Sequence, residues 1–160
     1  MNLKAELVDS MGSDDSIIRA MLVSTKGNNE EEASYGRINF LMKNRHGTPF
    51  EHNSMTFFVQ APICVFREFH RHRIGWSYNE MSGRYRELPA NYYMPPPQRP
   101  MIQQGKPGQY KFVLPEAEQY YDCVVAMDKA YTRATESYRE LLGLGIAKEV
   151  ARMVLPVGLY

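Results

Sequence analysis

The sequence contains few cysteines, no long apolar run and no large excess of charge of either sign. Its two cysteines, Cys64 and Cys123, are isolated and form no Cys-x-x-Cys pair, which argues against both a disulfide framework and a zinc ribbon. No apolar stretch approaches the roughly 20 residues needed to span a bilayer, and no signal-peptide pattern opens the chain. These absences predict a reduced, cytoplasmic setting without a membrane partner, in which both cysteines are core residues of apolar helical stretches.

Positive and negative side chains are nearly equal in number over the chain, but the Arg and His residues are clustered. Lys and Arg number 19 against 18 Asp and Glu, so a general coat for nucleic acid is not expected. However, five of the twelve Arg lie between Arg67 and Arg86, and all four His lie between His46 and His72. A chain of 160 residues is long enough to bury a sizeable core, and we expect residues 1–160 to form one domain.

The hydrophobic pattern predicts an α+β fold, with mixed helices packed on a small, antiparallel-rich sheet. Ser13 followed by two acidic residues is a good N-cap for a helix. Pro62 suits the first turn of another helix. We expect strands at 3–9 and, central to a sheet, at 54–59, and helices at 13–23, 30–44 and 61–73. The apolar cover of the helix at 30–44 is expected from Tyr35, Ile38, Phe40, Leu41 and Met42.

The second half of the chain is predicted to be a loop followed by a long helix. Residues 88–108 hold six of the ten Pro, which indicates a long loop. After Pro115, apolar residues recur at spacings of three and four and predict an amphipathic helix that Gly143 and Gly145 end. The simplest interpretation of this stripe is core packing, and a subunit interface is the alternative. The stripe comprises Tyr120, Val124, Met127, Tyr131, Ala134, Tyr138 and Leu141, and a short helix is expected at 146–154.

Residues 71–86 are the most informative segment, reading Arg-His-Arg-Ile-Gly-Trp-Ser-Tyr-Asn-Glu-Met-Ser-Gly-Arg-Tyr-Arg. Arg offers a planar donor fork for phosphate and a flat face for stacking. Together with the interleaved aromatic residues, this chemistry suits an anion that also presents a flat ring, such as a nucleotide or a flavin. A charge run of this kind is otherwise typical of a solvated basic face.

Two other chemistries are less favoured in this region. His70 and His72 are two residues apart and point to different sides of a helix, and the surrounding Arg would repel a cation, so no metal site is expected. Ser82 lacks the Gly-x-Ser-x-Gly setting of a nucleophile. A Ser beside Gly83 and Arg84 more often supplies hydroxyl and backbone N–H groups to a phosphate, and we favour that role.

The order of residues resembles the signature of the flavin-dependent thymidylate synthases, in which Arg-His-Arg, seven residues and Ser are often followed by Gly-Arg-Tyr. This chain has Arg71-His72-Arg73 and then Ser82-Gly83-Arg84-Tyr85, with an eight-residue spacer, Ile74 to Met81. The resemblance extends to the turn 46–52 before the strand at 54–59, to Val23-Ser24 and to 151–156, although 86–145 carries little specific signal.

The resemblance implies the methylation of dUMP to dTMP, with methylenetetrahydrofolate as carbon donor and FAD, reduced by NADPH, as hydride source. No protein nucleophile takes part in that family, and no metal is used. The implied FAD contacts are Ser24, His46, Thr48, Arg71, His72, Arg73 and Glu80. The implied dUMP contacts are Arg67, Glu68, Arg71, Glu80, Met81, Ser82, Gly83, Arg84 and Arg152. The resemblance further implies a homotetramer whose sites are shared between subunits.

The family continues beyond the segment matched by Val154-Leu155-Pro156, through further flavin contacts and the Arg that ionises the uracil ring, whereas this sequence stops at Tyr160. The expectation is therefore a chain without a catalytic residue of its own, corresponding to an N-terminal two-thirds and lacking turnover alone. The alternatives are a fragment that retains nucleotide or FAD binding, an RNA-binding module that uses its Arg and aromatic residues, and an inert folding unit that exposes apolar surface.

Overall fold

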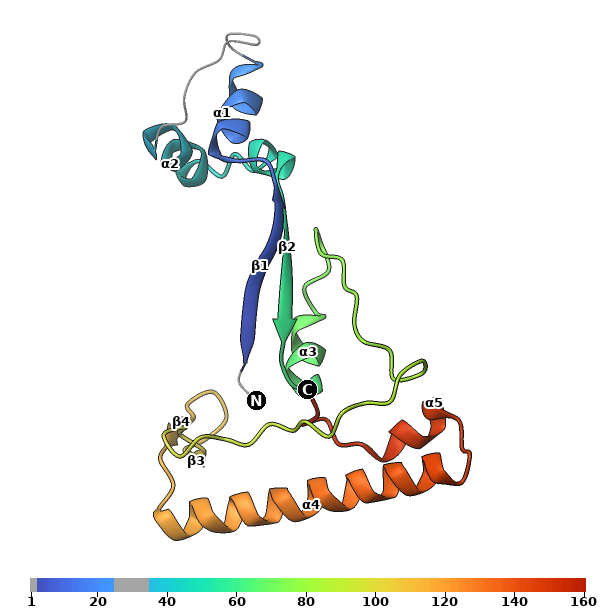
Figure 1. Cartoon of the computed structure of the whole chain (residues 1–160). Coiled ribbons are helices and arrows are strands. Elements are labelled where there is room, and N and C mark those ends of the chain that lie inside the picture. Colours follow the sequence, from blue (N-terminus) through green and yellow to red (C-terminus); the bar gives the residue numbers. More distant parts are fainter. Residues whose placement is uncertain (1–2, 25–34) are drawn as a thin grey trace. The chain divides into compact units, whose positions relative to one another are not determined.

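The computed structural model describes residues 3–24 and 35–160 (Figure 1). These residues form two compact units, 3–60 and 61–160. Each unit contains helices and one two-stranded antiparallel sheet. The predicted α+β class is therefore confirmed, while the assignment of the whole chain to one domain stays a prediction.

The unit formed by residues 3–60 is built on a long antiparallel strand pair. The first strand pairs with the second from Lys4↔Gln60 to Met11↔Ser54, with a register shift between Leu7 and Asp9. The elements are β1 (Lys4–Met11), α1 (Asp14–Leu22), α2 (Tyr35–Lys43), the 3-10 helix η1 (Thr48–His52) and β2 (Ser54–Gln60). The prediction that β2 is central to a sheet was wrong, because strand-forming side chains favour a strand without fixing how many partners it has.

The helices of this unit enclose a small core. Ser13 caps α1 as predicted, with its Oγ accepting a bond from the Ser16 N–H at 3.4 Å and Ser16 Oγ accepting one from the Ser13 N–H at 3.1 Å. The predicted start of the second helix lies outside the described residues, and the chain is helical from Tyr35. Of its expected apolar cover, Leu41 is buried, whereas Tyr35, Phe40 and Met42 are exposed. The buried residues of the two helices are Ile17, Ile18, Leu22 and Leu41.

The unit formed by residues 61–160 places a long helix beside a long irregular segment. Its elements are α3 (Ile63–Phe69), β3 (Ile102–Gln104), β4 (Lys111–Val113), α4 (Ala117–Gly143), α5 (Lys148–Ala151) and the 3-10 helix η2 (Arg152–Val154). The last residues of the chain form backbone hydrogen bonds with two other segments of the unit. The Ile63 N–H bonds to the Leu159 carbonyl at 2.8 Å, and the Tyr93 N–H bonds to the Gly158 carbonyl at 2.9 Å.

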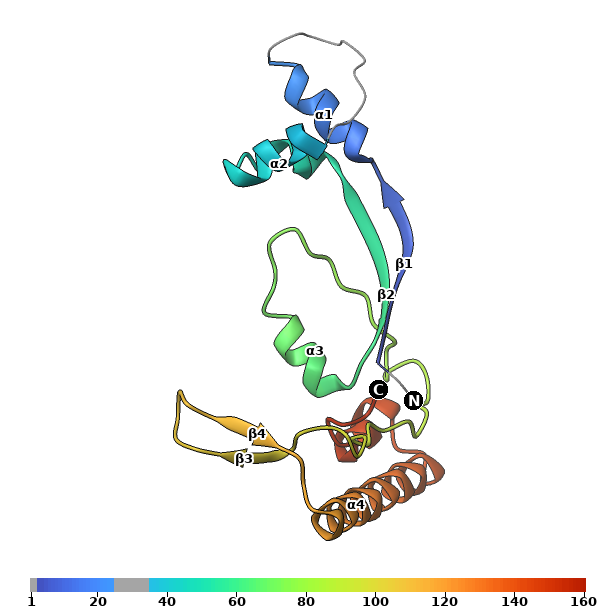
Figure 2. The same cartoon turned by 90° about the vertical axis from the view of Figure 1, so that its left-hand side faces the viewer.

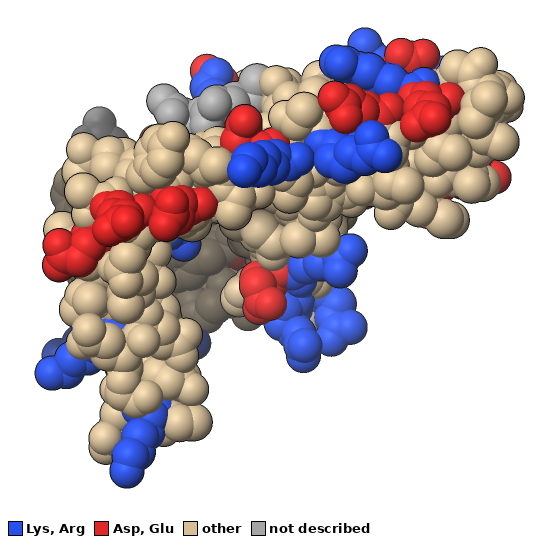
Figure 3. All heavy atoms as spheres, turned by 90° about the horizontal axis from the view of Figure 1, so that it is seen from below, with Lys and Arg blue, Asp and Glu red and all other residues tan. Residues whose placement is uncertain are grey.

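The long helix α4 confirms the amphipathic prediction. Every residue of the predicted stripe is at least half-buried, and Tyr138 is 3% exposed. Figure 3 views this helix from below and shows basic and acidic side chains interspersed on that face. The stripe therefore packs within its own unit, as the core interpretation expected. Of the helices in the described parts of the chain, none is both long and apolar enough to cross a membrane.

Helix α3 is shorter than predicted. It ends at Phe69, and Arg71 and Arg73 follow in irregular chain, so Arg67 and Arg71 do not share a helical face. The physical reason is a tightening of the backbone, because the N–H groups of Arg71 and His72 bond to carbonyls three residues back, at 3.1 and 3.0 Å.

Two further predictions were wrong in this unit. The loop expected at 88–108 contains β3, which pairs with β4 as a hairpin (Figure 2) because Gly105, at φ +97°, lets the backbone turn. Cys64 is exposed and Cys123 is half-buried, so neither is a fully buried core residue. Cys64 lies beside the half-buried stripe of α3, which comprises Ile63, Phe66 and Phe69.

Candidate functional site

A tight turn forms where the sequence predicts phosphate contacts. The carbonyl of Ser82 accepts hydrogen bonds from the N–H groups of Tyr85 and Arg86, both at 3.1 Å, and Ser82 Oγ accepts one from the Arg84 N–H at 3.3 Å. This turn, residues 82–86, is called the serine turn below. Because these three N–H groups are used within the turn, the groups of this stretch that could contact an anion are the Ser82 hydroxyl, the Gly83 N–H and the side chain of Arg84.

Gly83 brings Arg152 to the serine turn. Gly83 is buried, and a Cβ built on it would lie 2.8 Å from Leu88 Cδ1 and 3.1 Å from Arg152 Cδ. The aliphatic part of Arg152, at the first position of η2, therefore lies against the turn. The fold thus brings together two residues of the predicted dUMP set that lie far apart in sequence.

Other cationic side chains lie at the same turn. The Arg84 guanidinium lies 5.1 Å from the centre of the Tyr85 ring, and its Nη2 donates to the Tyr85 hydroxyl at 3.2 Å. Lys148 Nζ donates to the Tyr85 carbonyl at 3.5 Å. Tyr85 and Lys148 were absent from the predicted site, although a Lys four residues before Arg152 was a signal that could have indicated the second.

The remaining predicted residues of this unit lie on α3 and the segment after it. Arg67 and Glu68 are on the helix, Arg71 to Arg73 follow it, and Glu80 and Met81 precede the serine turn. All seven are exposed. Sequence reasoning also missed Tyr78, whose hydroxyl lies 2.6 Å from the His72 carbonyl oxygen.

The arginines of the predicted site differ in ion pairing from an arginine on α4. With respect to the residues that the structure describes, none of Arg67, Arg71, Arg73, Arg84 and Arg152 has a carboxylate within ion-pair distance. By contrast, Arg133 on α4 pairs with Glu136 at 3.6 Å. A guanidinium without a carboxylate partner can offer its donors to a phosphate, although Nη2 of Arg84 already donates to the Tyr85 hydroxyl.

Three predicted FAD contacts belong to the other unit. Ser24 follows α1 and donates through Oγ to the Met21 carbonyl at 3.0 Å, and Thr48 opens η1. His46 follows the end of α2, where Arg45 adopts a left-handed φ of 54° and the His46 N–H bonds to the Leu41 carbonyl at 2.9 Å. This C-terminal cap fixes the backbone at His46.

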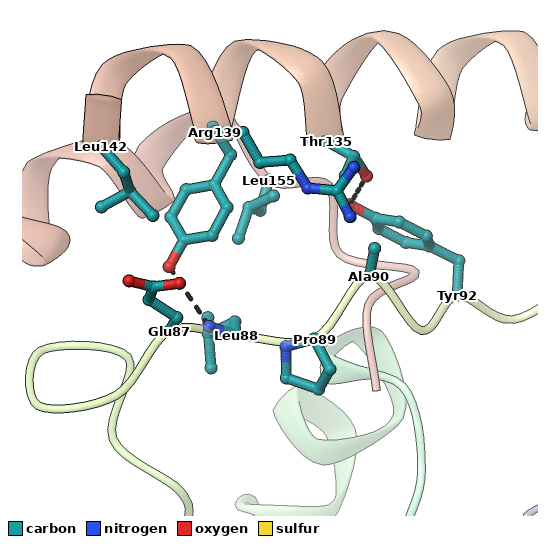
Figure 4. Close-up of a pocket in the computed structure, with 10 residues that line it drawn as sticks. Glu87, Leu88, Pro89, Ala90, Tyr92, Thr135, Arg139, Leu142 and Leu155 are labelled. Atoms are coloured by element: carbon teal, nitrogen blue, oxygen red, sulfur yellow. Dashed lines mark hydrogen bonds between the residues drawn. The ribbon is translucent and has the colours of Figure 1, made fainter. Parts of the chain in front are cut away.

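A separate pocket of about 240 Å³ lies between residues 87–92 and α4 (Figure 4). Its walls are held by a bond from the Leu88 N–H to the Tyr138 hydroxyl at 3.2 Å and by one between the Tyr92 and Thr135 hydroxyls at 3.0 Å. Arg139 and Glu87 line it with apolar side chains. The pocket contains none of the predicted FAD or dUMP residues. Among the described residues, no group of three or more His, Cys, Asp or Glu side chains could hold a metal ion.

The fold and this site define an α+β protein with an exposed, arginine-rich segment between α3 and the serine turn. Known proteins identify the family. The family model described as "Thymidylate synthase complementing protein" matches residues 6–160. The flavin-dependent thymidylate synthase of Streptomyces coelicolor is 52% identical over 166 residues, covering 99% of this chain and 68% of the relative. That of Thermotoga neapolitana is 43% identical, covering 97% and 66%.

Solved structures agree with these relatives. The UMP/dUMP methylase PolB from Streptomyces cacaoi, bound with 5-Br dUMP, is 46% identical and superposes with a TM-score of 0.88, covering 99% of this chain and 69% of that one. The same enzyme bound with 5-Br UMP gives a TM-score of 0.87. This chain belongs to the flavin-dependent thymidylate synthase family, which confirms the resemblance seen in residues 71–86.

Proposed function

We propose that this protein methylates dUMP to dTMP, taking the carbon from methylenetetrahydrofolate and the hydride from FAD that NADPH has reduced, and that the residues of this chain supply contacts to the nucleotide and the flavin. The observation that carries the proposal is the serine turn, in which the Arg84 N–H bonds to Ser82 Oγ and Gly83 lies against the stem of Arg152. Family membership supports the reaction class, and the arginines without carboxylate partners support an anionic nucleotide as substrate.

The phosphate of dUMP is assigned to the serine turn. The Ser82 hydroxyl, the Gly83 N–H and the Arg84 and Arg152 guanidinium groups would hold it. Each charge-assisted bond from Arg contributes roughly 1.5–3 kcal/mol, so two such bonds would supply much of the affinity. Arg67, Glu68, Arg71, Glu80 and Met81 are assigned to the rest of the nucleotide.

The flavin is assigned to the residues after α3. Arg71, His72 and Arg73 present two guanidinium groups and one imidazole in consecutive exposed positions, and these donors fit the pyrophosphate and the polar ring edge of FAD. Ser24, His46, Thr48 and Glu80 complete the proposed set. When bound, FAD supplies the hydride-transfer chemistry, and the residues of the chain bind and orient both ligands. No metal and no nucleic acid enters the proposal.

A homotetramer is part of the same proposal, and so is a cytoplasmic location. Both strands of the long sheet expose large apolar side chains, among them Val8 at 63%, Met55 at 64% and Phe58 at 48%. Large apolar side chains exposed on both strands favour a protein–protein interface over a solvated sheet. The molar mass in solution, measured by light scattering, tests this part. A mass of four chains is expected, and a monomer at micromolar concentration would contradict it.

Calorimetric titration with dUMP, UMP and deoxyuridine tests the substrate. The solved relatives are described as UMP/dUMP methylases, so both nucleotides are compared. We expect saturable binding of dUMP and at least about tenfold weaker binding of deoxyuridine, which lacks the phosphate. Arg152→Ala should weaken dUMP about tenfold or more, whereas Arg133→Ala on α4 should not. Equal affinity for dUMP and deoxyuridine would overturn the assignment of the serine turn to phosphate.

A further inference from the structure

The segment between α3 and the serine turn is held mainly by one side chain. From His70 to Met81, every side chain is exposed except that of Tyr78, which is half-buried. Between Ile74 and Met81, the backbone hydrogen bond found among the described residues is a long one, from the Trp76 N–H to the Arg73 carbonyl at 3.4 Å. Regular secondary structure therefore does not fix this segment.

The Tyr78 hydroxyl closes the segment back on the end of α3. It lies 2.6 Å from the His72 carbonyl oxygen and 3.2 Å from the Phe69 carbonyl oxygen. A phenol has one proton to donate. The hydroxyl therefore donates mainly to the nearer carbonyl, that of His72, and the Phe69 carbonyl is the weaker, second acceptor of the same proton. Both carbonyls belong to the turns in which α3 ends. The Phe69 carbonyl also accepts the His72 N–H at 3.0 Å, whereas the His72 carbonyl receives its bond from Tyr78. The bond therefore closes residues 73–77 into a loop between His72 and Tyr78.

The Tyr78 ring reinforces the bond. Its centre lies 4.6 Å from the His70 ring and 5.6 Å from the Phe69 ring, in both cases edge-on. On the same side, Trp76 is nearly parallel to Tyr78, at 8° and 6.2 Å, and meets Phe69 at 5.2 Å. Aromatic pairs of this geometry stabilise their arrangement beyond the burial of the rings. The rings of Phe69, His70, Trp76 and Tyr78 are called the aromatic cluster below.

We propose that Tyr78 is the positioning residue for the flavin contacts, because it holds the backbone of His72 between Arg71 and Arg73. The proposal rests on the function above, in which these three residues bind FAD. The same bond folds the eight-residue spacer back on α3, so the additional residue is accommodated in the exposed loop 73–77. The serine turn has its own hydrogen bonds and its own contact with Arg152, so it does not depend on Tyr78.

The variant Tyr78→Phe tests the proposal because it removes the hydroxyl and keeps the ring. Tyr120→Phe is the matched control, since the half-buried Tyr120 hydroxyl also donates to a backbone carbonyl, that of Pro95, at 3.0 Å. Loss of one such bond predicts FAD binding about threefold to tenfold weaker in Tyr78→Phe, with the dissociation constant of dUMP changed by less than about twofold. Unchanged FAD binding, or an equal loss in Tyr120→Phe, would overturn the positioning role.

Fluorescence of Trp76 provides a readout that needs no ligand. Trp76 is the only tryptophan in the chain, and it belongs to the aromatic cluster. Tyr78→Phe should increase quenching of Trp76 by acrylamide, while Tyr120→Phe should leave it unchanged. Unchanged quenching in a Tyr78→Phe chain whose parent binds FAD overturns the inference and leaves the proposed function standing. Absence of FAD binding by the parent overturns the flavin assignment, and with it the role of Tyr78, whatever the fluorescence shows.

Discussion

Gly83 and Arg152 are in such close contact that no side chain fits between them. A Cβ on Gly83 would lie 3.1 Å from Arg152 Cδ, and the same atom would lie 2.8 Å from Leu88 Cδ1. The glycine is required here for space and not for a left-handed backbone, because its φ lies outside the positive range. The contact joins the motif at residues 82–85 to the later motif at 151–156.

The first prediction follows from this contact. Gly83→Ala should displace the stem of Arg152 and weaken dUMP binding by about threefold to thirtyfold, since the guanidinium is moved and not removed. The atoms that a Cβ would meet belong to flexible side chains, so the fold should survive. Calorimetric titration with dUMP measures the effect, and circular dichroism verifies the fold. An alanine variant that binds dUMP like the parent would show that Arg152 does not hold the nucleotide.

The second prediction separates the two ligands. Arg84→Ala should weaken dUMP by about tenfold to a hundredfold and change FAD far less, and Arg73→Ala should do the reverse. Both residues lack a carboxylate partner among the described residues, so neither substitution leaves a buried charge unpaired. The dissociation constants of both ligands are measured for both variants. Substitutions that weaken both ligands equally would contradict the division of the site.

The third prediction concerns the packing of the last residues against α4. A Cβ on Gly158 would overlap the Tyr131 hydroxyl and lie 3.0 Å from Tyr131 Cζ, so Gly158→Ala should lower the free energy of unfolding by about 1–3 kcal/mol. Gly143→Ala is the matched control. Gly143 ends α4, a Cβ added to it would meet nothing within 4 Å, and alanine there should be neutral or stabilising. Urea unfolding measures the free energy of unfolding of both variants. Equal values for the two variants would contradict the close packing of Gly158 against Tyr131.

The fourth prediction is a loss of stability at alkaline pH. Burial raises the pKa of Tyr131 above 10.0, with further contributions from Cys64, Tyr92 and Cys123, and burial also raises the pKa of Tyr160. A phenol that keeps its proton longer in the folded state than in the unfolded state leaves stability unchanged below about pH 10. Above that value the unfolded state loses the proton first, so the free energy of unfolding falls.

The variant Tyr131→Phe isolates this effect. It keeps the ring that stacks on Tyr92 at 4.4 Å and removes the titrating group. Urea unfolding between about pH 8 and about pH 11 should show a shallower alkaline decline in the variant than in the parent. If the two declines are the same, ionisation of Tyr131 does not contribute to the loss.

The sequence predicted those features that depend on local chemistry. The stripe from Tyr120 to Leu141 indicated α4 because apolar residues at a period of three to four lie on one face of an α-helix. Ser13 indicated the start of α1 because its hydroxyl caps the helix. The short hairpin of β3 and β4 was not predicted, because its strands have three residues each and their pairing depends on a turn at Gly105. Long-range pairing also decided that, within the described ranges 3–24 and 35–160, β2 pairs with β1 alone.

For the site, too, the sequence predicted the residues of local motifs but not the contacts between distant residues. Residues 82–85 were identified from their order, and Arg152 from a second motif, but only the fold shows that Gly83 lies against Arg152. The end of α3 at Phe69 was missed because nothing in the local pattern stops the helix there. The Tyr78 hydroxyl donates to carbonyls at that end, six and nine positions earlier in the chain.

The most direct test of the central claim is a titration of the purified chain with FAD, followed by its visible absorption spectrum and accompanied by the intact mass. We expect a saturable change in the flavin band, which dUMP then perturbs further because both ligands occupy neighbouring residues of one segment. A flavin spectrum that stays that of free FAD at every protein concentration, for a chain of confirmed mass, would contradict the assignment of Arg71, His72 and Arg73 to the flavin.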